Sequence, residues 1–177
     1  MPVRNVHERV LAASIDHVGL LIDGLASPGD RLWPRDRWPA MKFDRGLQVG
    51  AAGGHGPIRY VVDAYEPGRS VRFRFTGPKG FVGSHGFALD ALDGDRVRIR
   101  HVLEMRVEGK ARLSWPFVYR PLHDALIEDA FDRAEAQFGG QVRRPRWSGW
   151  VRVLRRLLAR HYPPRLPTPT RRGSPPW

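Results

Sequence analysis

Residues 96–107 read RVRIRHVLEMRV, and they carry the clearest structural pattern in the chain. Every second residue from Val97 to Val107 is apolar, except for His101, and arginine dominates the positions between them. Successive side chains on a strand point to opposite faces, so this pattern predicts a strand with one buried face and one wet face. Such one-sided burial is typical of an antiparallel sheet.

Further strand candidates surround this segment. Residues 57–66, 70–76 and 84–92 are rich in aromatic and β-branched types or alternate in the same way. Pro67-Gly68 and Asp93-Gly94 are turn signals between consecutive segments. A first strand is predicted over residues 3–11, and a weaker one around 41–49. Together these segments predict a run of antiparallel strands.

Two helices are predicted to pack with the sheet. Residues 15–26 have helical spacing of apolar side chains, with Ser14 as the N-cap. A longer helix follows Trp115-Pro116 and ends at Gly139-Gly140, where glycine commonly terminates a helix. Its apolar stripe consists of Tyr119, Leu122, Leu126, Ile127, Ala130, Phe131, Ala134 and Phe138. The order of elements predicts an α+β fold in which a curved sheet wraps around this helix and leaves an apolar space at the open end.

Charge divides the chain into two parts. The 177 residues carry a formal net charge of +12, but residues 139–177 contain ten arginines and no acidic residue, whereas residues 1–138 have 20 basic and 18 acidic residues. We therefore expect a nearly neutral ligand-binding domain over 1–138 and an Arg/Pro-rich tail over 139–177. The chain has no cysteine, which excludes disulfides and thiolate chemistry and fits a cytoplasmic protein.

Three stretches resemble the START/Bet v 1-like superfamily, also described as SRPBCC or polyketide cyclase/dehydrase-like proteins. They are VRNVHERVLAASIDHVGLLI (3–22), IRYVVDAYEPGRSVRFRF (58–75) and FVYRPLHDALIEDAFDRAEAQF (117–138). The resemblance covers about residues 3–138 and implies a helix-grip fold with a hydrophobic cavity. Members of this superfamily bind lipids, polyketides, sterols or hormones, and some catalyse cyclisation or dehydration. The superfamily has no universal catalytic residue to carry over to this sequence.

His85 and His101 are the most informative candidate site residues, because each lies on the apolar face of its predicted strand. A histidine in an apolar cavity can orient a ligand hydroxyl or act as a general acid/base. The alternative is a buried imidazole that bonds a backbone group or water. The residues expected to line the cavity are Tyr60, Phe73, Phe75, His85, Phe87, Ile99, His101, Leu103 and Leu126. Arg59 and Glu104 are interpreted as parts of solvated strand faces.

Other catalytic and cofactor motifs are missing from the sequence. Residues 53–56 (GGHG) lack the lysine and the following helix of a phosphate loop, and we interpret them as a turn at the cavity mouth. The seven histidines include no His-x-x-x-His pair, and no G-x-S-x-G occurs. We therefore expect neither a metal site nor a cofactor.

Residues 147–162 (WSGWVRVLRRLLARHY) predict an amphipathic helix within the tail. Trp147, Trp150 and leucines share one face, while Arg152, Arg155, Arg156 and Arg160 lie opposite. This arrangement suits an anionic membrane surface, which would make the protein peripheral at a membrane. The alternatives are docking on the body or a partner and, less favoured, binding to nucleic acid. Residues 163–177 are rich in proline and are predicted to be disordered.

Trp33 and Trp38 either form an aromatic lid or anchor a long loop on the sheet, and the anchor role is favoured. The function that these patterns favour is the binding or transport of a small hydrophobic molecule, lipid-like or polyketide-like. The alternatives are a cyclase- or dehydratase-type enzyme that uses His85, His101 or Tyr60, and a basic interaction protein that acts through its tail.

Overall fold

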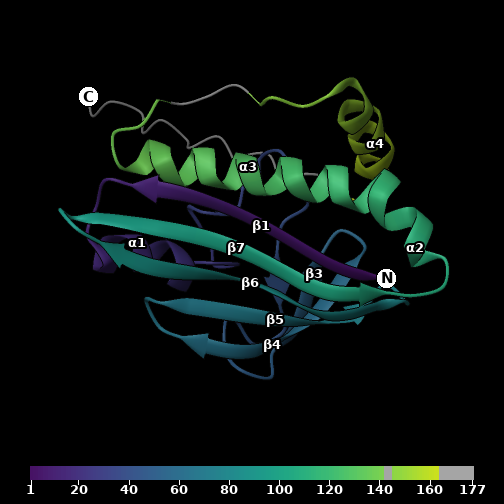
Figure 1. Ribbon diagram of the computed structural model, residues 1–177, viewed down its shortest axis with the longest axis horizontal. Coiled ribbons are helices and arrows are strands. Elements are labelled where there is room, and N and C mark those ends of the chain that lie inside the picture. The colour runs from purple at the N-terminus through teal and green to yellow at the C-terminus, as the bar shows by residue number, and fades with distance from the viewer. Residues whose placement is uncertain (142–144, 164–177) are drawn as a thin grey trace, which may run out of the picture.

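The computed structural model describes residues 1–141 and 145–163. Within them, a seven-stranded antiparallel sheet has the order β1-β7-β6-β5-β4-β3-β2 and curves under a long helix (Figure 1). The strands are β1 (Pro2–Leu11), β2 (Lys42–Phe43), β3 (Ala52–His55), β4 (Ile58–Glu66), β5 (Ser70–Gly77), β6 (Phe81–Leu92) and β7 (Arg96–Val107). The helices are α1 (Ile15–Asp23), α2 (Ala111–Ser114), a π-helical turn η1 (Trp115–Tyr119), α3 (Arg120–Gln137) and α4 (Gly149–Ala159). The predicted α+β helix-grip architecture is confirmed.

Alternation predicted the central strands well. The segment 96–107 forms β7 with the predicted bounds, and its inward face is buried from Val97 to Val107. The Asp93-Gly94 turn joins it to β6, which begins at Phe81, three residues before the predicted start. The hairpin across Pro67-Gly68 joins β4 and β5. The alternation of apolar and polar residues predicted these strands because one face of each strand packs against the core.

The weak strand predicted over 41–49 is wrong. Only Lys42–Phe43 is extended there, and the glycine-rich segment Ala52–His55 forms β3 instead. A Cβ on Gly53 would lie 2.0 Å from the carbonyl oxygen of Lys42, so this pairing requires glycine for close backbone approach. Glycine is depleted in ordinary strands, which is why β-propensity missed this one.

Helical structure begins before Trp115-Pro116, earlier than predicted, although α3 itself starts at Arg120. The chain turns into α2 at Ala111 and passes through η1, where the amide of Arg120 bonds the carbonyl of Trp115. That wider turn accommodates Pro116, whose ring cannot donate a backbone hydrogen bond. Trp115 is thereby buried beneath the start of α3.

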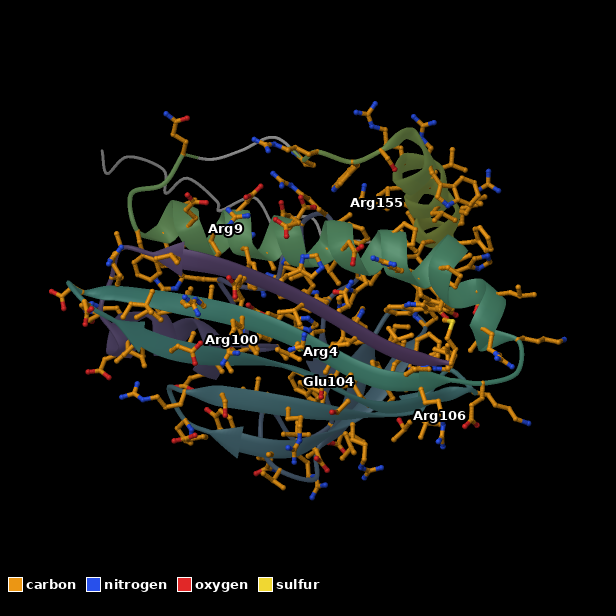
Figure 2. All side chains as sticks on the ribbon, viewed as in Figure 1. Arg4, Arg9, Arg100, Glu104, Arg106 and Arg155 are labelled. Atoms are coloured by element: carbon orange, nitrogen blue, oxygen red, sulfur yellow. The ribbon has the colours of Figure 1, made fainter. Side chains whose placement is uncertain are left out.

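Charged side chains hold α3 against β1, the edge strand that lies beside it (Figure 2). Asn5 donates to Asp124 at 2.9 Å, and Arg9 donates to Asp132 at 3.0 Å and to Glu135 at 2.6 Å. These partners are half-buried, and each ion pair joins residues more than a hundred positions apart. The polar face of β1 therefore faces the helix.

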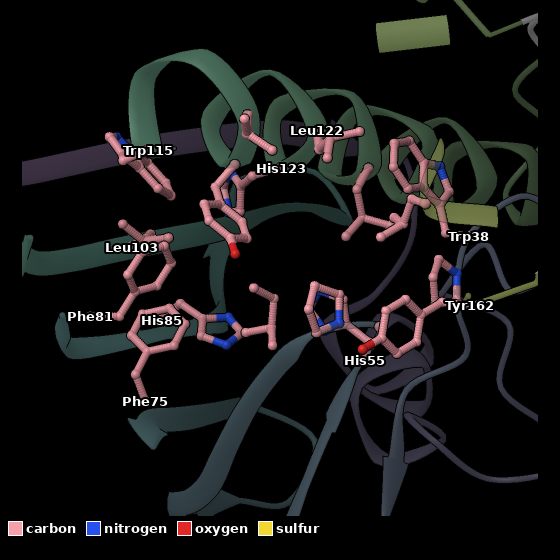
Figure 3. A pocket seen from close by; sticks show the side chains of 18 residues that line it. Trp38, His55, Phe75, Phe81, His85, Leu103, Trp115, Leu122, His123 and Tyr162 are labelled. Atoms are coloured by element: carbon pink, nitrogen blue, oxygen red, sulfur yellow. The ribbon is translucent and has the colours of Figure 1, made fainter. Parts of the chain in front are cut away.

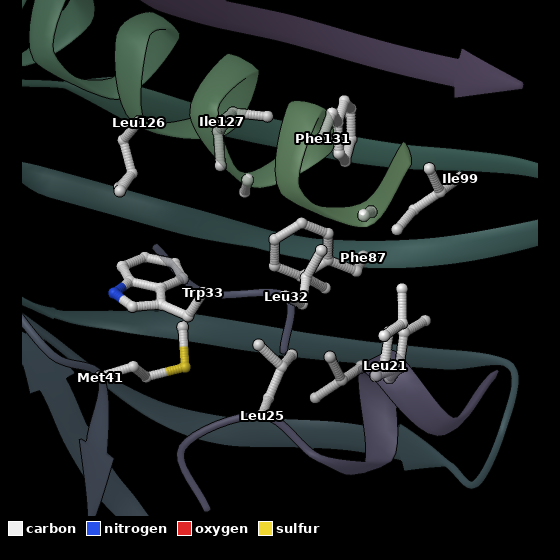
Figure 4. Close-up of a cluster of buried hydrophobic side chains, with 14 of the residues drawn as sticks. Leu21, Leu25, Leu32, Trp33, Met41, Phe87, Ile99, Leu126, Ile127 and Phe131 are labelled. Atoms are coloured by element: carbon white, nitrogen blue, oxygen red, sulfur yellow. The ribbon is translucent and has the colours of Figure 1, made fainter. Parts of the chain in front are cut away.

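The apolar core fills the end of the grip that contains α1 (Figure 4). Leu21 and Leu25 pack there with Phe87 and Phe131, all at most 1% exposed. Trp33 is also buried, and its indole donates to the carbonyl of Pro39 at 2.9 Å, as expected of an anchor. This filled end leaves the opposite end of the sheet open.

Helix α4 packs on α3, with Val151 and Leu154 as its buried residues. Ser148 caps it by accepting a hydrogen bond from the amide of Val151 at 3.2 Å, so the helix spans Gly149–Ala159 rather than the predicted 147–162. No helix of the described residues has both the length and the apolar character needed to cross a membrane. The segment predicted to be disordered, residues 163–177, lies outside the described residues apart from Pro163.

Candidate functional site

A cavity of about 290 Å³ lies between the sheet and the first turns of α3 (Figure 3). Its walls are mostly aromatic and aliphatic, with Phe75 and Phe81 from the sheet and Trp115 and Leu122 from the helical side. A wider depression outside it shares Pro39, His55, Gly56 and Tyr162 with the cavity. These four residues therefore form the boundary between the cavity and the surface.

Four predicted site residues line this cavity, namely Phe75, His85, Leu103 and Leu126. Phe73, Phe87 and Ile99 do not, because they lie in the packed core with at most 1% exposure. The prediction that they line the cavity is corrected: alternation tells which face a side chain occupies, but other side chains fill that face, with Phe131 against Phe87 and Phe43 against Phe73.

Tyr60 and His101 are placed beside the cavity rather than on its wall. Tyr60 is 1% exposed, and its hydroxyl lies 3.0 Å from Nδ1 of His55, which does line the cavity. Burial raises the pKa of Tyr60 well above its usual range, so the phenol stays protonated. His101 lies behind His85.

His85 and His101 form a buried pair across β6 and β7. Nδ1 of His85 lies 3.2 Å from Nε2 of His101, although the direct register partners are His85 with Leu103 and Phe87 with His101. Burial lowers the pKa of both rings well below the usual value, and neighbouring histidines lower it further. Both rings are therefore neutral at pH 7. Among the described residues, Nε2 of His85 and Nδ1 of His101 have no hydrogen-bond partner.

His123 is a cavity residue that the sequence prediction missed. Nδ1 of its ring lies 3.3 Å from Oδ1 of Asp124, and Nε2 is buried without a partner in the part of the chain that the structure describes. Burial lowers the pKa of His123, and the nearby Asp124 only partly opposes that effect. The helical spacing of Tyr119, Leu122 and Leu126 already marked this face of α3, so residue 123 was within reach of the same pattern.

His7 reaches the same carboxylate from β1. Its Nε2 lies 3.2 Å from Oδ1 of Asp124 and its Nδ1 lies 2.7 Å from Glu128. Burial would lower the pKa of His7, but hydrogen bonds and charges from these two carboxylates raise it to about 9. Burial would likewise raise the pKa of Asp124, but hydrogen bonds from His123 and His7 hold it below its usual range. The result is a protonated His7 and an ionised Asp124.

Among the described residues, His7, His123 and Asp124 are a set whose potential metal-ligating atoms lie within 4.8 Å of one another. The sequence had given no sign of this cluster, because its members come from opposite ends of the domain. Hydrogen bonds to one carboxylate oxygen account for the arrangement. A metal ion would also have to displace the proton of His7. We therefore interpret the cluster as a hydrogen-bonded network.

Neither a protein-family model nor a curated protein matches this sequence. Solved structures do match the fold. Norcoclaurine synthase from Thalictrum flavum is 17% identical, with a TM-score of 0.57 over 80% of this chain and 96% of that one. CalU16 from Micromonospora echinospora is 14% identical, with a TM-score of 0.55 over 90% and 85%. Ara h 8.0201 is 16% identical, with a TM-score of 0.55 over 78% and 98%.

The chain has the helix-grip fold of the Bet v 1-like proteins. Norcoclaurine synthase and Ara h 8.0201 are matched over nearly their whole length, whereas about a fifth of this chain lies outside each match.

Trp38, Trp147 and Arg155 fasten α4 to the helix-grip body. Both indoles donate to the buried carboxylate of Asp129, at 2.7 Å and 3.0 Å, and the guanidinium of Arg155 lies 3.6 Å from the centre of the Trp147 ring. Arg155 also donates to the carbonyl of Arg37. Trp147 and Arg155, which the sequence placed on a membrane- or partner-binding face, thus make contacts within the molecule.

Leu158 and Tyr162, which belong to the same tail, line the cavity. The tail therefore forms part of the cavity's wall, although the helix-grip resemblance stopped before it. Trp38 joins them on that wall and is 2% exposed.

Proposed function

We propose that this protein binds a small, largely apolar molecule that also carries a hydrogen-bonding group. The supporting observation is an apolar cavity that contains the unpartnered Nε2 atoms of His85 and His123. A buried polar atom without a partner costs roughly 1–3 kcal/mol. A ligand that satisfies these two nitrogens would recover that cost, while its apolar remainder packs against the aromatic walls.

The cavity's size restricts the ligand. About 290 Å³ lies just below the roughly 300–1,000 Å³ typical of small-molecule pockets. A compact ring system fits this volume better than a long acyl chain does. Lipid transport is therefore less favoured than binding of a compact aromatic or polyketide-like molecule.

Binding of 2-naphthol tests this function, with naphthalene as the analogue without a hydroxyl. We expect 2-naphthol to bind more tightly, because its hydroxyl can bond a cavity histidine. Leu122→Trp fills the cavity and should weaken binding at least about tenfold, which corresponds to roughly 1.4 kcal/mol. Leu113→Trp, on the exposed side of α2, is the matched control. Equal affinity of the two variants in isothermal titration calorimetry would contradict the proposed site.

We further propose that the outer side of α4 contacts an anionic membrane surface. Trp150, Val153 and Leu157 are 51%, 43% and 50% exposed, and Phe117, 64% exposed, adjoins Trp150 through a 2.7 Å hydrogen bond from the indole to its carbonyl. We name these four residues the outer apolar stripe. Arg152, Arg156 and Arg160 lie exposed along the same helix.

The chemistry of this surface favours lipid over nucleic acid. Exposed tryptophan and leucine beside arginines suit the boundary between headgroups and acyl chains. Phosphate neutralisation along nucleic acid would use the arginines but would leave the apolar side chains in water. Most of the outer apolar stripe lies on α4, and Leu158 of the same helix lines the cavity. A membrane-bound protein would therefore hold that wall of the cavity near the bilayer.

A further inference from the structure

His85 and His123 place two unsatisfied ring nitrogens in one apolar cavity, and their protonation states can be deduced from their partners. Figure 3 shows both rings among the side chains of the lining. His85 comes from β6 and His123 from α3, so the two rings approach the cavity from the sheet side and the helix side. Each ring is held from behind by a hydrogen-bonded neighbour.

His123 presents a hydrogen-bond acceptor to the cavity. Its Nδ1 faces Oδ1 of Asp124 at 3.3 Å, and an ionised carboxylate can only accept. The proton of the neutral ring therefore sits on Nδ1, and Nε2 carries a lone pair. A carboxylate behind a histidine also stabilises the imidazolium that forms when Nε2 takes up a proton.

His85 presents a hydrogen-bond donor. If Nδ1 of His85 carried the proton of the 3.2 Å bond, Nδ1 of His101 would be a buried N–H without an acceptor. The opposite arrangement leaves the unpartnered N–H on Nε2 of His85 instead, but His85 lines the cavity, where water or a ligand can accept that hydrogen bond, whereas His101 does not line it. The favoured arrangement therefore has His101 donating through Nε2, which leaves the proton of His85 on Nε2, inside the cavity.

We propose that the cavity catalyses proton transfer on an apolar ketone, with His123 as the general base and His85 as the donor to the carbonyl oxygen. This activity rests on the ligand-binding function proposed above. An acceptor for an acidic C–H and a donor for the adjacent oxygen are the two groups that enolisation requires.

The step is redox-neutral and needs no co-reactant. Nε2 of His123 takes a proton from the carbon next to the carbonyl, and the C–H electron pair becomes the C=C bond. The carbonyl π pair moves to the oxygen, where Nε2–H of His85 stabilises the enolate by a hydrogen bond. His123 then returns the proton to the same carbon or, in a conjugated substrate, to another one.

Asp124 and His7 are positioning residues in this scheme. Asp124 fixes the tautomer of His123, and His7 and Asn5 donate to the same oxygen of Asp124 from β1, at 3.2 Å and 2.9 Å. Asp124 thus holds its orientation through contacts from two elements, and neither His7 nor Asn5 lines the cavity.

Exchange of the α-protons of 2-tetralone in deuterated buffer tests the proposal, with proton NMR as the readout. We expect wild-type protein to accelerate exchange above the buffer rate, and His123→Gln to lose about 100-fold or more of that acceleration. His85→Gln should lose at least about tenfold. His17→Gln, an exposed histidine on α1, is the matched control and should exchange like wild type.

Asp124→Asn separates positioning from direct catalysis. An amide at position 124 can donate to Nδ1 of His123 and move the ring proton to Nε2, so exchange should fall at least about tenfold while 2-tetralone binding stays within about twofold. The wild-type rate should also fall as pH drops below the ordinary histidine range, since His123 must be neutral. The titratable groups that face it are Asp124 on its own helix, His7 on β1, His55 on β3, His85 on β6 and His101 on β7.

Two outcomes would overturn the proposal. One is exchange at the buffer rate with wild-type protein, whether or not the ketone binds. The other is undiminished exchange in His123→Gln, with folding of that variant verified by circular dichroism. Calorimetric binding of 2-tetralone and 2-naphthol is measured separately, and loss of both would contradict the ligand-binding function as well.

Discussion

Asp129 is a buried carboxylate whose partners come from two other parts of the chain. It lies on α3 and is 3% exposed, and it accepts hydrogen bonds from the indoles of Trp38 and Trp147. Arg37 lies 3.7 Å from its other oxygen. Burial raises the pKa of Asp129, and these donors only partly oppose the rise. The side chain's main contribution is therefore to accept two indole protons, more than to carry a charge.

We expect Asp129→Ala to lower the free energy of unfolding by about 2–4 kcal/mol, because it leaves two indole N–H groups without an acceptor. Asp129→Asn keeps an acceptor oxygen and removes the buried charge, so its stability should stay within about 1 kcal/mol of wild type. Urea denaturation followed by tryptophan fluorescence measures both. Equal losses in the two variants would show that the charge matters more than the accepted hydrogen bonds.

Helix α4 has two apolar sides with different surroundings. Val151 and Leu154 are buried against the body, whereas Trp150, Val153 and Leu157 face outward. The sequence showed one amphipathic helix and left docking and membrane contact as alternatives. The structure permits both at once, because the helix docks by one side and keeps the outer apolar stripe exposed.

Matched substitutions on α4 separate these two contacts. Leu157→Asp should weaken sedimentation with phosphatidylserine vesicles about tenfold and leave stability nearly unchanged, because it alters only the exposed side. Leu154→Asp places a charge in the buried side and should undock the helix, which speeds trypsin cleavage within 145–163 at least about tenfold.

Pure phosphatidylcholine vesicles are the control for charge in the same experiment. Wild-type binding that is equal for both lipids, or absent for both, would contradict the membrane proposal. Loss of vesicle binding in Leu154→Asp with retention in Leu157→Asp would assign lipid contact to the side of α4 that is buried against the body, which also contradicts the proposal.

Across the whole molecule, five histidines fall into two groups with opposite pKa shifts. Burial would lower the pKa of His7, but Asp124 and Glu128 raise it to about 9. Burial lowers the pKa of His55 to about 3, and it also lowers the pKa values of His85, His101 and His123. Folding therefore favours the protonated form of His7 and the neutral form of the cavity histidines. The free energy of unfolding should peak near pH 6.5, the value for an unperturbed histidine.

The two sides of that maximum have different causes. Above pH 6.5 the stabilisation from His7 is lost progressively up to about pH 9, by roughly 1–2 kcal/mol once solvent screening around its carboxylates is allowed for. Below pH 6.5 the cavity histidines bind protons in the unfolded chain but stay neutral in the folded protein, so the free energy of unfolding falls again. His7→Gln should flatten the alkaline side and keep the acid side. Urea denaturation between pH 4 and about 9.5 measures the profile, and an unchanged alkaline side in His7→Gln would refute this assignment.

Local patterns predicted most of the sheet but only part of the site. The period-two segments became β4 to β7, and the weakly patterned 41–49 did not become a continuous strand. His85 and Leu103 were correctly placed on the cavity wall, and Phe87 and Ile99 were not. The difference arises because alternation contains no information about where along a strand the opposing face is filled.

The sequence by itself determined which side chains face inward, the neutral body and the basic tail, since these follow from the pleat of a strand and from charge composition. Only the tertiary structure brought His7 to Asp124, 117 positions away, and placed His123 in the same cavity as His85. Those contacts depend on β1 lying along both β7 and α3, and on α1 and its loop filling one end of the grip. Long-range packing therefore decided which inward histidines reach the cavity and which of their nitrogens remain free.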